Sequence, residues 1–419
     1  MRLRKEKKIS PNPSDLDFCS IAELTKALRS RKISASELLE HVIARIEALD
    51  QRVNAVVVRD FDRARATAKA ADAALARGDQ RPLLGIPVTL KEPFNIAGLP
   101  TTWGYPEFRD FVPTEDALIV SRLKAAGAVV IGKTNIPLGL RDFQSYNDIY
   151  GTTNNPWDVG RSPGGSSGGS AASLAVGLGA LSIGSDIGGS VRVPAHFCGV
   201  YGHKTSLGVV PLRGYTLPPA HVPGSGDLGV VGPIARHASD LALALDVIAG
   251  PDEAREGIGY QVKFPPPRHD DLSDFRVLVI DTHPLMPTSN AVRTMIEALA
   301  ERLSKLRTKV TYQSASLPNL ADSAPLYMKL LNAAKSPRES SDSFVETQQL
   351  SEALSPSDHR LQAERMRGTV ISHRERLAAD AARLQLAQQW RSSASAMSCS
   401  VRRLPRSDRA KGGLDLTRL

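Results

Sequence analysis

Residues 160–170 read GRSPGGSSGGS, and the fold assignment depends on how this stretch is interpreted. A glycine- and serine-rich composition is typical of flexible linkers. Strand and helix patterns continue on both sides of it, however, and a second cluster, SDIGGSVRVPA (185–195), follows a predicted small-residue helix over 168–178. Two such clusters indicate a backbone that must approach other groups closely or adopt positive φ angles. Tight turns around a closely packed helix are the purely structural alternative.

The chain has 419 residues, of which 42% are hydrophobic and 23% charged, a balance that predicts a globular protein. Its net charge of +9 arises at the ends, in residues 1–8 (MRLRKEKK) and 391–419, while the segment between is close to neutral. Terminal charge runs are usually solvated, so we expect no nucleic-acid partner. Neither an apolar run of about 18 residues nor a signal-peptide pattern is found, which predicts a cytoplasmic protein without membrane association.

Motifs for metals and phosphates are missing from the sequence. The three cysteines (Cys19, Cys198 and Cys399) form no CxxC pair, and the histidines form no HExxH. No glycine cluster is followed by the lysine of a P-loop, and no GxSxG elbow occurs. We therefore predict no metal and no cofactor.

Hydrophobic periodicity predicts alternating helices and strands. Ser34 and Glu37 have capping-box spacing at the start of a helix, and 62–78 forms a second, alanine-rich helix. Apolar runs at 84–90 and 128–131 predict strands on either side of a helix at 118–126. Further helices are expected at 240–248, 291–306 and 377–390, and a strand at 275–280. This alternation favours an α/β fold.

Three separated blocks together resemble the amidase signature family. They are GIPVTLKEPFNIAGLPTTWG (85–104), the pair GKTNIP (132–137) and YGTTNNPWD (150–158), and the glycine-rich segment from 160 onward. The resemblance covers about 20–390 and implies one large α/β domain with a central mixed, mostly parallel twisted sheet covered by helices. We place this domain at 11–390, with its signature core at 83–235, between a basic tail at 1–10 and a disordered, non-family tail at 391–419.

The resemblance also implies a catalytic triad of Ser190, Ser166 and Lys91. Ser190 would be the nucleophile, and Ser166, after a cis peptide bond, would relay its proton to Lys91. An alcohol needs a base to become nucleophilic. Lysine serves as a base only when neutral, so its pKa must move from about 10.4 to near 7 through burial with few anions nearby. The adjacent Glu92 must then point elsewhere.

Four backbone N–H groups would form the oxyanion hole, those of Ile187, Gly188, Gly189 and Ser190. The expected reaction is hydrolysis of a small-molecule carboxylic amide to an acid and ammonia or an amine, through an acyl-enzyme. The resemblance leaves a homodimer open. Other residues near the signature are expected to be structural partners or to line the pocket: Asp186, Arg192, Arg161, Cys198, Gln144, Tyr146, Asn147 and Tyr150.

The sequence departs from the family near its end. After LQLAQQWR (384–391) the family continues into an aromatic patch and an apolar strand, whereas SSASAMSCSVRRLPRSDRAKGG (392–413) follows here. We expect a truncated or altered C-terminal part, so an inactive or impaired amidase remnant is the alternative function. An amidotransferase subunit is a further alternative, but the Ser-Leu-Asp-Gln run of that subunit is missing after Gly208.

Overall fold

The computed structural model describes residues 16–218, 227–254, 259, 261–314 and 317–398. Backbone contacts divide the chain into two compact units, Met1–Lys263 (unit 1) and Phe264–Leu419 (unit 2). The basic tail predicted at 1–10 and residues 399–419 of the predicted C-terminal tail lie outside the described residues.

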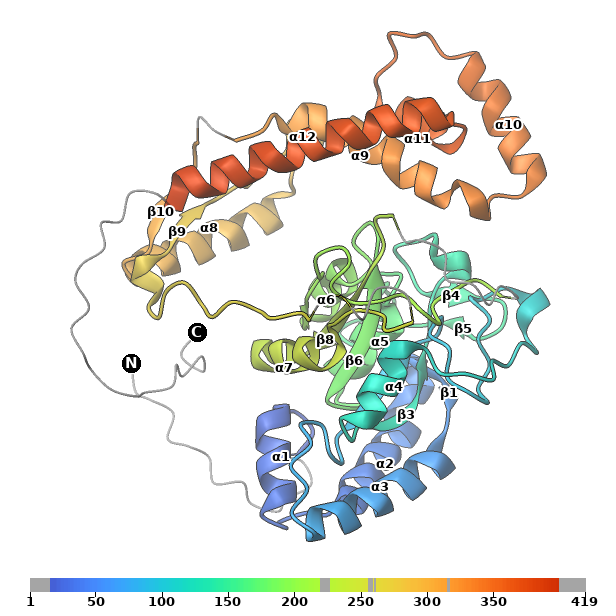
Figure 1. Ribbon diagram of the computed structural model, residues 1–419, viewed down its shortest axis with the longest axis vertical. Helices are drawn as coiled ribbons and strands as arrows, with labels where there is room; N and C mark the ends of the chain where they lie inside the picture. The colour runs from blue at the N-terminus through green and yellow to red at the C-terminus, as the bar shows by residue number, and fades with distance from the viewer. Residues whose placement is uncertain (1–15, 219–226, 255–258, 260, 315–316, 399–419) are drawn as a thin grey trace. The chain divides into compact units, whose positions relative to one another are not determined.

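Unit 1 contains the sheet and most of the helices, and Figure 1 shows its strands in the middle with helices around them. Its helices are α1 (Ile21–Arg29), α2 (Ala35–Val53), α3 (Phe61–Ala76), α4 (Leu118–Ala125), α5 (Gly168–Ala175), α6 (Arg192–Cys198) and α7 (Ala238–Ile248). Its strands are β1 (Val56–Arg59), β2 (Pro87–Lys91), β3 (Val129–Thr134), β4 (Tyr146–Asn147), β5 (Gly151–Thr152), β6 (Leu181–Asp186), β7 (Tyr201–Gly202) and β8 (Val230–Ala235).

The central sheet has six strands in the order β1-β3-β2-β6-β8-β7. Strand β2 pairs in parallel with β3 and β6, whereas the pairs β1–β3, β6–β8 and β7–β8 are antiparallel. The prediction of an α/β fold with a mixed, helix-covered sheet is confirmed. The sheet is also mostly parallel in strand direction, as predicted, because β2, β3, β6 and β7 run one way and β1 and β8 run the other.

Every residue of β2, β3, β6 and β8 is buried. Helices cover these strands, so even polar residues within them, such as Ser182 and Lys133, are buried. Helix α3 contacts β3, α7 contacts β8, and α5 contacts β1, β2, β3, β6 and β8. The strands at the middle of the sheet are therefore shielded from water, and side chains at their ends are held in a fixed environment.

Small residues let α5 lie directly on the sheet and on neighbouring loops. A Cβ atom added to Gly168 would lie 2.3 Å from Ser145 Oγ, and one added to Gly169 would lie 2.4 Å from the backbone nitrogen of Asn135. Both distances are shorter than any real contact, so a larger residue would push the helix away. The glycine-rich stretch is thus part of a packed core and does not tether two domains.

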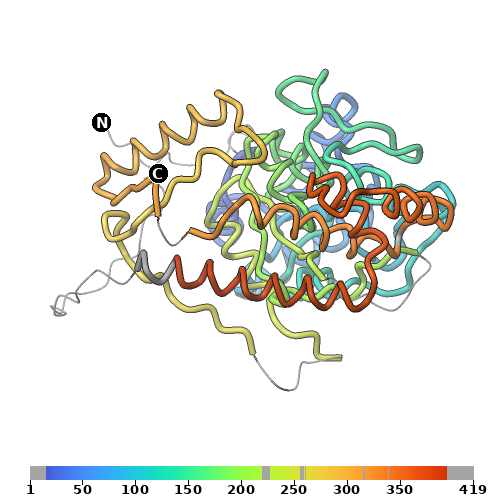
Figure 2. Tube along the Cα trace, turned by 90° about the horizontal axis from the view of Figure 1, so that it is seen from above, coloured from blue at the N-terminus to red at the C-terminus, as the bar shows by residue number. Residues whose placement is uncertain are grey.

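Unit 2 combines a small βαβ element with a group of helices. Its elements are β9 (Arg276–Leu278), α8 (Asn290–Lys305), β10 (Lys309–Thr311), α9 (Leu320–Lys335), α10 (Ser341–Glu352), α11 (Leu361–Thr369) and α12 (His373–Ser398). Strands β9 and β10 are parallel, and α9 packs against α11 and α12. Helix α12, the long red helix of Figure 2, continues to Ser398, past residue 391 where the sequence predicts disorder.

Most predicted elements are present with shifted ends. The capping box of Ser34 and Glu37 is formed, and α3, α4, α5, α7, α8 and β9 lie where periodicity predicts them. Strand β2 begins at Pro87 instead of Leu84, because 82–85 form a turn in which the N–H of Leu84 donates to Arg81 and that of Ile86 donates to Leu83. Helices α10 and α11 were not predicted, since their polar composition hides the helical period. Helix α9 was not predicted either, although its residues are mainly apolar.

We predict that Gly132→Ala destabilises unit 1. Gly132 has φ +153° in β3, and a Cβ there would lie 2.2 Å from the carbonyl oxygen of Val58 in β1. Overpacking of this kind lowers the free energy of unfolding by about 2–3 kcal/mol, which urea denaturation followed by fluorescence would measure. Gly229→Ala is the matched control, because a Cβ at Gly229 meets nothing within 4 Å. Equal urea midpoints for the two variants would contradict the prediction.

Candidate active site

Lys91 is the last residue of β2, and its side chain is completely buried. Its Nζ atom lies 2.6 Å from Ser166 Oγ, 3.0 Å from Ser185 Oγ and 3.5 Å from the carbonyl oxygen of Ser185. None of these three partners is an acid. Burial disfavours the charged form of an amine, and hydroxyl and carbonyl oxygens stabilise that form less than a carboxylate would.

The carboxylate of Glu92 points away from the amine of Lys91, as predicted for an acid next to a neutral catalytic lysine. It accepts hydrogen bonds from the N–H groups of Thr102 (2.5 Å) and Trp103 (3.0 Å). The chain leaves β2 after Lys91 and turns at Glu92, which explains why these neighbours in sequence separate. The carboxylate that follows Lys91 in sequence is therefore used to fix the loop that carries Trp103.

A second lysine, Lys133, is also completely buried but has a different environment. Its Nζ atom donates to the carbonyl oxygen of Pro100 and to Thr101 Oγ1. Burial lowers the pKa of Lys133 to about 8, and the charge of Glu92 works in the opposite direction. Lys133 in β3 and Glu92 directly after β2 thus hold the same loop.

Ser166 follows Gly165 across a cis peptide bond, as the family resemblance implies. A Cβ added to Gly165 would lie 2.2 Å from the carbonyl oxygen of Gln144 and 2.8 Å from that of Asp142. Backbone atoms therefore occupy all the space that a side chain would need. The glycine before Ser166 is required by this close approach of two chain segments.

Ser190 lies next to the loop that carries Ser166, because a backbone hydrogen bond joins Ser190 to Ser167. Its carbonyl oxygen accepts a hydrogen bond from the N–H of Ser167 at 3.1 Å, and its side chain is 6% exposed. Within the described part of the chain, the hydroxyls of Ser166 and Ser190 are not hydrogen bonded to each other. Such contacts are often long without a substrate and tighten when one binds.

Asp186 shapes the turn that carries Ser190. Its carboxylate accepts from the N–H groups of Gly189 (2.9 Å) and Val191 (3.1 Å), and it forms an ion pair with the guanidinium of Arg192 at 2.9 Å. Burial alone would raise the pKa of Asp186, but the hydrogen bonds from Arg192 and the turn outweigh it and hold that pKa below its ordinary value. Asp186 and Arg192 are therefore structural partners, as expected.

The turn involves one of the four N–H groups predicted for the oxyanion hole. The N–H of Gly189 donates to Asp186 Oδ1 at 2.9 Å, so it is already engaged within the turn. The N–H groups of Gly188 and Ser190 make no hydrogen bond to the residues that the structure describes. The sequence could not reveal this difference, because it depends on which N–H groups the carboxylate of Asp186 reaches.

Three residues near the site were not singled out from the sequence. Ser185 contacts Lys91, and Ser185 Oγ lies 2.6 Å from the hydroxyl of Tyr215. The ring of Phe143 is 52% exposed, and one of its carbons would lie 3.5 Å from a Cβ atom at Gly189. Phe143 precedes the segment in which pocket-lining residues were predicted. Position in β6 directly before Asp186 is the only sequence signal for Ser185.

The other expected neighbours have structural contacts. The amide of Asn147 donates to Asn135 and Ile136, and the hydroxyl of Tyr150 donates to Glu92 at 3.4 Å. Cys198 is buried, and this burial raises the pKa of its thiol to about 12. Within the described residues, no group of His, Cys, Asp or Glu side chains could hold a metal ion.

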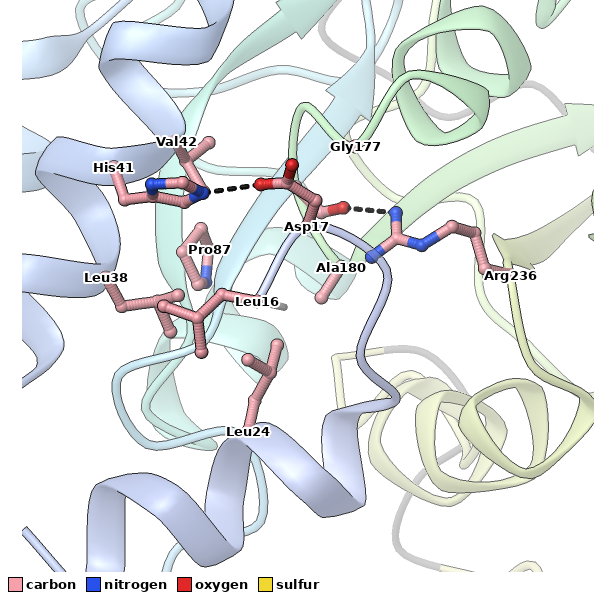
Figure 3. Close-up of a pocket in the computed structure, with 11 residues that line it drawn as sticks. Leu16, Asp17, Leu24, Leu38, His41, Val42, Pro87, Gly177, Ala180 and Arg236 are labelled. Atoms are coloured by element: carbon pink, nitrogen blue, oxygen red, sulfur yellow. Dashed lines mark hydrogen bonds and ion pairs between the residues drawn. The ribbon is translucent and has the colours of Figure 1, made fainter. Parts of the chain in front are cut away.

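A small pocket lies elsewhere in unit 1, between the start of the described chain, α2 and the segment that leads into β6 (Figure 3). Asp17 occupies its centre, 2.5 Å from His41 Nε2 and 2.5 Å from the guanidinium of Arg45. None of Lys91, Ser166 and Ser190 lines it. These contacts of Asp17 fasten the first described residues to α2, so the pocket is a structural feature.

The comparisons with known proteins agree with this geometry. The family model described as Amidase matches residues 37–400. Over 245 residues the chain is 45% identical to a glutamyl-tRNA(Gln) amidotransferase subunit from Anaeromyxobacter sp. (strain K), covering 58% of this chain and 49% of that protein. The chain therefore spans about half the length of this curated relative.

Two solved structures have the same fold. A fatty acid amide hydrolase superposes with a TM-score of 0.76 at 24% identity, covering 91% of this chain and 67% of that one. A 6-aminohexanoate cyclic dimer hydrolase complexed with its substrate has a TM-score of 0.70 at 25% identity, covering 90% and 78%. With a family model that matches most of its length, the chain belongs to the amidase signature family.

Proposed function

We propose that this protein hydrolyses a carboxylic amide through an acyl-enzyme on Ser190. The observation that carries the proposal is the buried amine of Lys91, 2.6 Å from Ser166 Oγ, with Ser190 beside the same loop. Membership of the amidase family supports the reaction class. The hydroxyl of Ser190 attacks the amide carbonyl, the nitrogen of the substrate leaves as ammonia or an amine, and water then releases the acid.

The proton of Ser190 passes to Lys91 through Ser166. A serine hydroxyl accepts one hydrogen bond and donates another, so Ser166 takes a proton from Ser190 and gives its own to the amine. This requires the neutral form of Lys91, which complete burial among hydroxyl and carbonyl oxygens favours. When the tetrahedral intermediate collapses, the proton returns by the same route to the leaving nitrogen.

Backbone N–H groups of the turn after Asp186 stabilise the oxyanion. Gly188 and Ser190 are the donors that the contacts of the turn support, with Ile187 beside them, since the N–H of Gly189 is engaged by Asp186. Loss of one such donor typically slows an enzyme by about 10²–10³-fold. The reaction as proposed uses no metal and no organic cofactor, because base, relay and oxyanion donors all come from this chain.

One member of an amidotransferase complex is a second candidate, and the 45% identity to an amidotransferase subunit favours it. Both candidates use the same triad, so they differ in substrate and partners. An impaired remnant is the third candidate, because the C-terminal sequence departs from the family.

Among the described residues, none of the helices has the length and apolar character of a bilayer-spanning segment. We propose a cytoplasmic location.

A panel of amides separates these candidates. The purified chain is expected to release ammonia or amine from at least one aryl, alkyl or indole-type amide, and mass spectrometry should find an acyl adduct on Ser190. Ser190→Ala should abolish both signals, because no other hydroxyl replaces the nucleophile, while Ser206→Ala on the exposed surface should leave them unchanged. If glutamine is the only amide from which ammonia is released, this would favour the amidotransferase hypothesis. Turnover by Ser190→Ala would refute the proposal, and a folded wild-type chain without activity would favour the remnant.

Lys91→Ala is expected to lower kcat/KM by about 10²–10⁴-fold, the usual contribution of a positioned general base. The rise of kcat/KM with pH that accompanies loss of the proton from Lys91 should also disappear. Lys69→Ala, at an exposed position of α3, is the control for removal of a positive charge. Rates measured from acid to alkaline pH test this, and a wild-type pH profile in Lys91→Ala would exclude Lys91 as the base.

Asp186→Asn tests the turn. The amide group places a donor where the carboxylate accepts from Gly189 or Val191, so we expect kcat to fall by about tenfold for the lost hydrogen bonds.

Because the folded-state pKa of Asp186 is depressed, its stabilising effect is present above its unfolded pKa of about 3.9 and is lost as pH falls through the lower folded value. As the pH is lowered from 5, the Tm of wild type should therefore fall more steeply than the Tm of Asp186→Asn. Parallel curves would contradict this role.

A further inference from the structure

Two serine hydroxyls of the described residues lie at hydrogen-bond distance from the amine of Lys91. Besides Ser166 Oγ at 2.6 Å, Ser185 Oγ lies at 3.0 Å, and Ser185 Oγ is itself 2.6 Å from the hydroxyl of Tyr215. The proton route described above uses only Ser166. A second hydroxyl at hydrogen-bond distance from a general base either supports the base or competes for its lone pair, so its orientation matters.

The hydrogen-bond inventory of an amine defines what Ser185 must do. A neutral amine has two N–H donors and one lone pair, and an ammonium has three donors and no lone pair. Proton transfer requires the lone pair of Lys91 to face Ser166. Ser185 must then accept from Lys91, and after transfer the three N–H groups meet three acceptors: Ser166 Oγ, Ser185 Oγ and Ser185 O.

We propose that Tyr215 is a positioning residue whose phenol oxygen accepts the hydroxyl proton of Ser185 and so keeps the lone pair of Lys91 open to Ser166. A serine hydroxyl rotates freely about its C–O bond unless a partner fixes it. With its proton directed to Tyr215, Ser185 presents only lone pairs to the amine. Without that acceptor, the hydroxyl of Ser185 turns toward Lys91 and competes with Ser166. This inference rests on the proposed function, because it concerns the base of that reaction.

The ring of Tyr215 is held in place by two other aromatic side chains. Its centroid lies 4.9 Å from that of Phe94 and 5.0 Å from that of Trp103, both of which are completely buried. The backbone N–H of Trp103 donates to the carboxylate of Glu92, the residue after β2, and this hydrogen bond holds Trp103 near the end of that strand. Tyr215→Phe therefore keeps the ring and its packing and removes only the hydroxyl.

Ionisable groups on the surrounding strands stay unchanged in the variants that test this. They are Glu92 directly after β2, Lys133 in β3 and Asp186 in β6, each with hydrogen-bond partners of its own. The hydroxyl of Tyr215 is the additional titratable group at Ser185. A change in the pH dependence of Tyr215→Phe consequently reports the orientation of Ser185 and the protonation of Lys91.

The test is the rate at which an alkyl fluorophosphonate labels Ser190, which needs no knowledge of the natural substrate. Ser190 Oγ bonds to phosphorus, fluoride leaves, and the hydroxyl proton passes through Ser166 to Lys91. Tyr215→Phe should label about tenfold more slowly at alkaline pH, the effect of one misdirected hydrogen bond. Its rate should also reach its plateau at lower pH than wild type, because donation from Ser185 favours the neutral amine.

A double variant separates positioning from mere packing. Adding Ser185→Ala to Tyr215→Phe removes the competing hydroxyl, so the double variant should label faster than Tyr215→Phe and as fast as Ser185→Ala alone. Tyr201→Phe, at an exposed tyrosine of β7, should match wild type. A further slowing in the double variant, or a wild-type rate and pH profile in Tyr215→Phe, would overturn the inference. Failure of the wild-type chain to label at Ser190 would instead count against the proposed function.

Discussion

The contact between a fully buried lysine amine and serine hydroxyls is the constraint on which the rest of the site depends. Lys91 ends a strand whose residues are all buried, so its amine meets oxygens that the surrounding segments provide. Carboxylates in place of those oxygens would hold it charged. The fold bonds Glu92 to the N–H groups of Thr102 and Trp103 and pairs Asp186 with Arg192, so both acids hold the backbone around the site.

Close approach of backbone segments brings the hydroxyls to this amine. The glycines of 160–170 allow the segment around Gln144 to pass directly over Gly165, and they allow α5 to rest on the sheet. The residues that contact Lys91 consequently come from distant parts of the sequence but belong to one packed unit. Such packing orients hydroxyl groups without long side chains, which would lose more conformational freedom on folding.

Residue patterns predicted much of this organisation. Ser34 and Glu37 gave the start of α2 correctly, and the two glycine clusters located the loops that carry Ser166 and Ser190. The direction of β8 was not predictable, because this strand reads as an apolar run whichever way it lies. The engagement of Gly189 by Asp186, and the contact from Tyr215 to Ser185, depend on three-dimensional placement and leave no periodic signal in the sequence.

The surroundings of Gly165 have a consequence for how this chain can vary. The atoms that exclude a side chain there are the carbonyl oxygens and the nitrogen of residues 142 and 144, all of them main-chain atoms. Every amino acid carries these atoms, so no exchange elsewhere in 142–144 makes room for a larger residue. A second mutation can restore space where two side chains collide, but this position offers no such suppressor. Glycine is therefore required at position 165, whichever residues stand at 142–144.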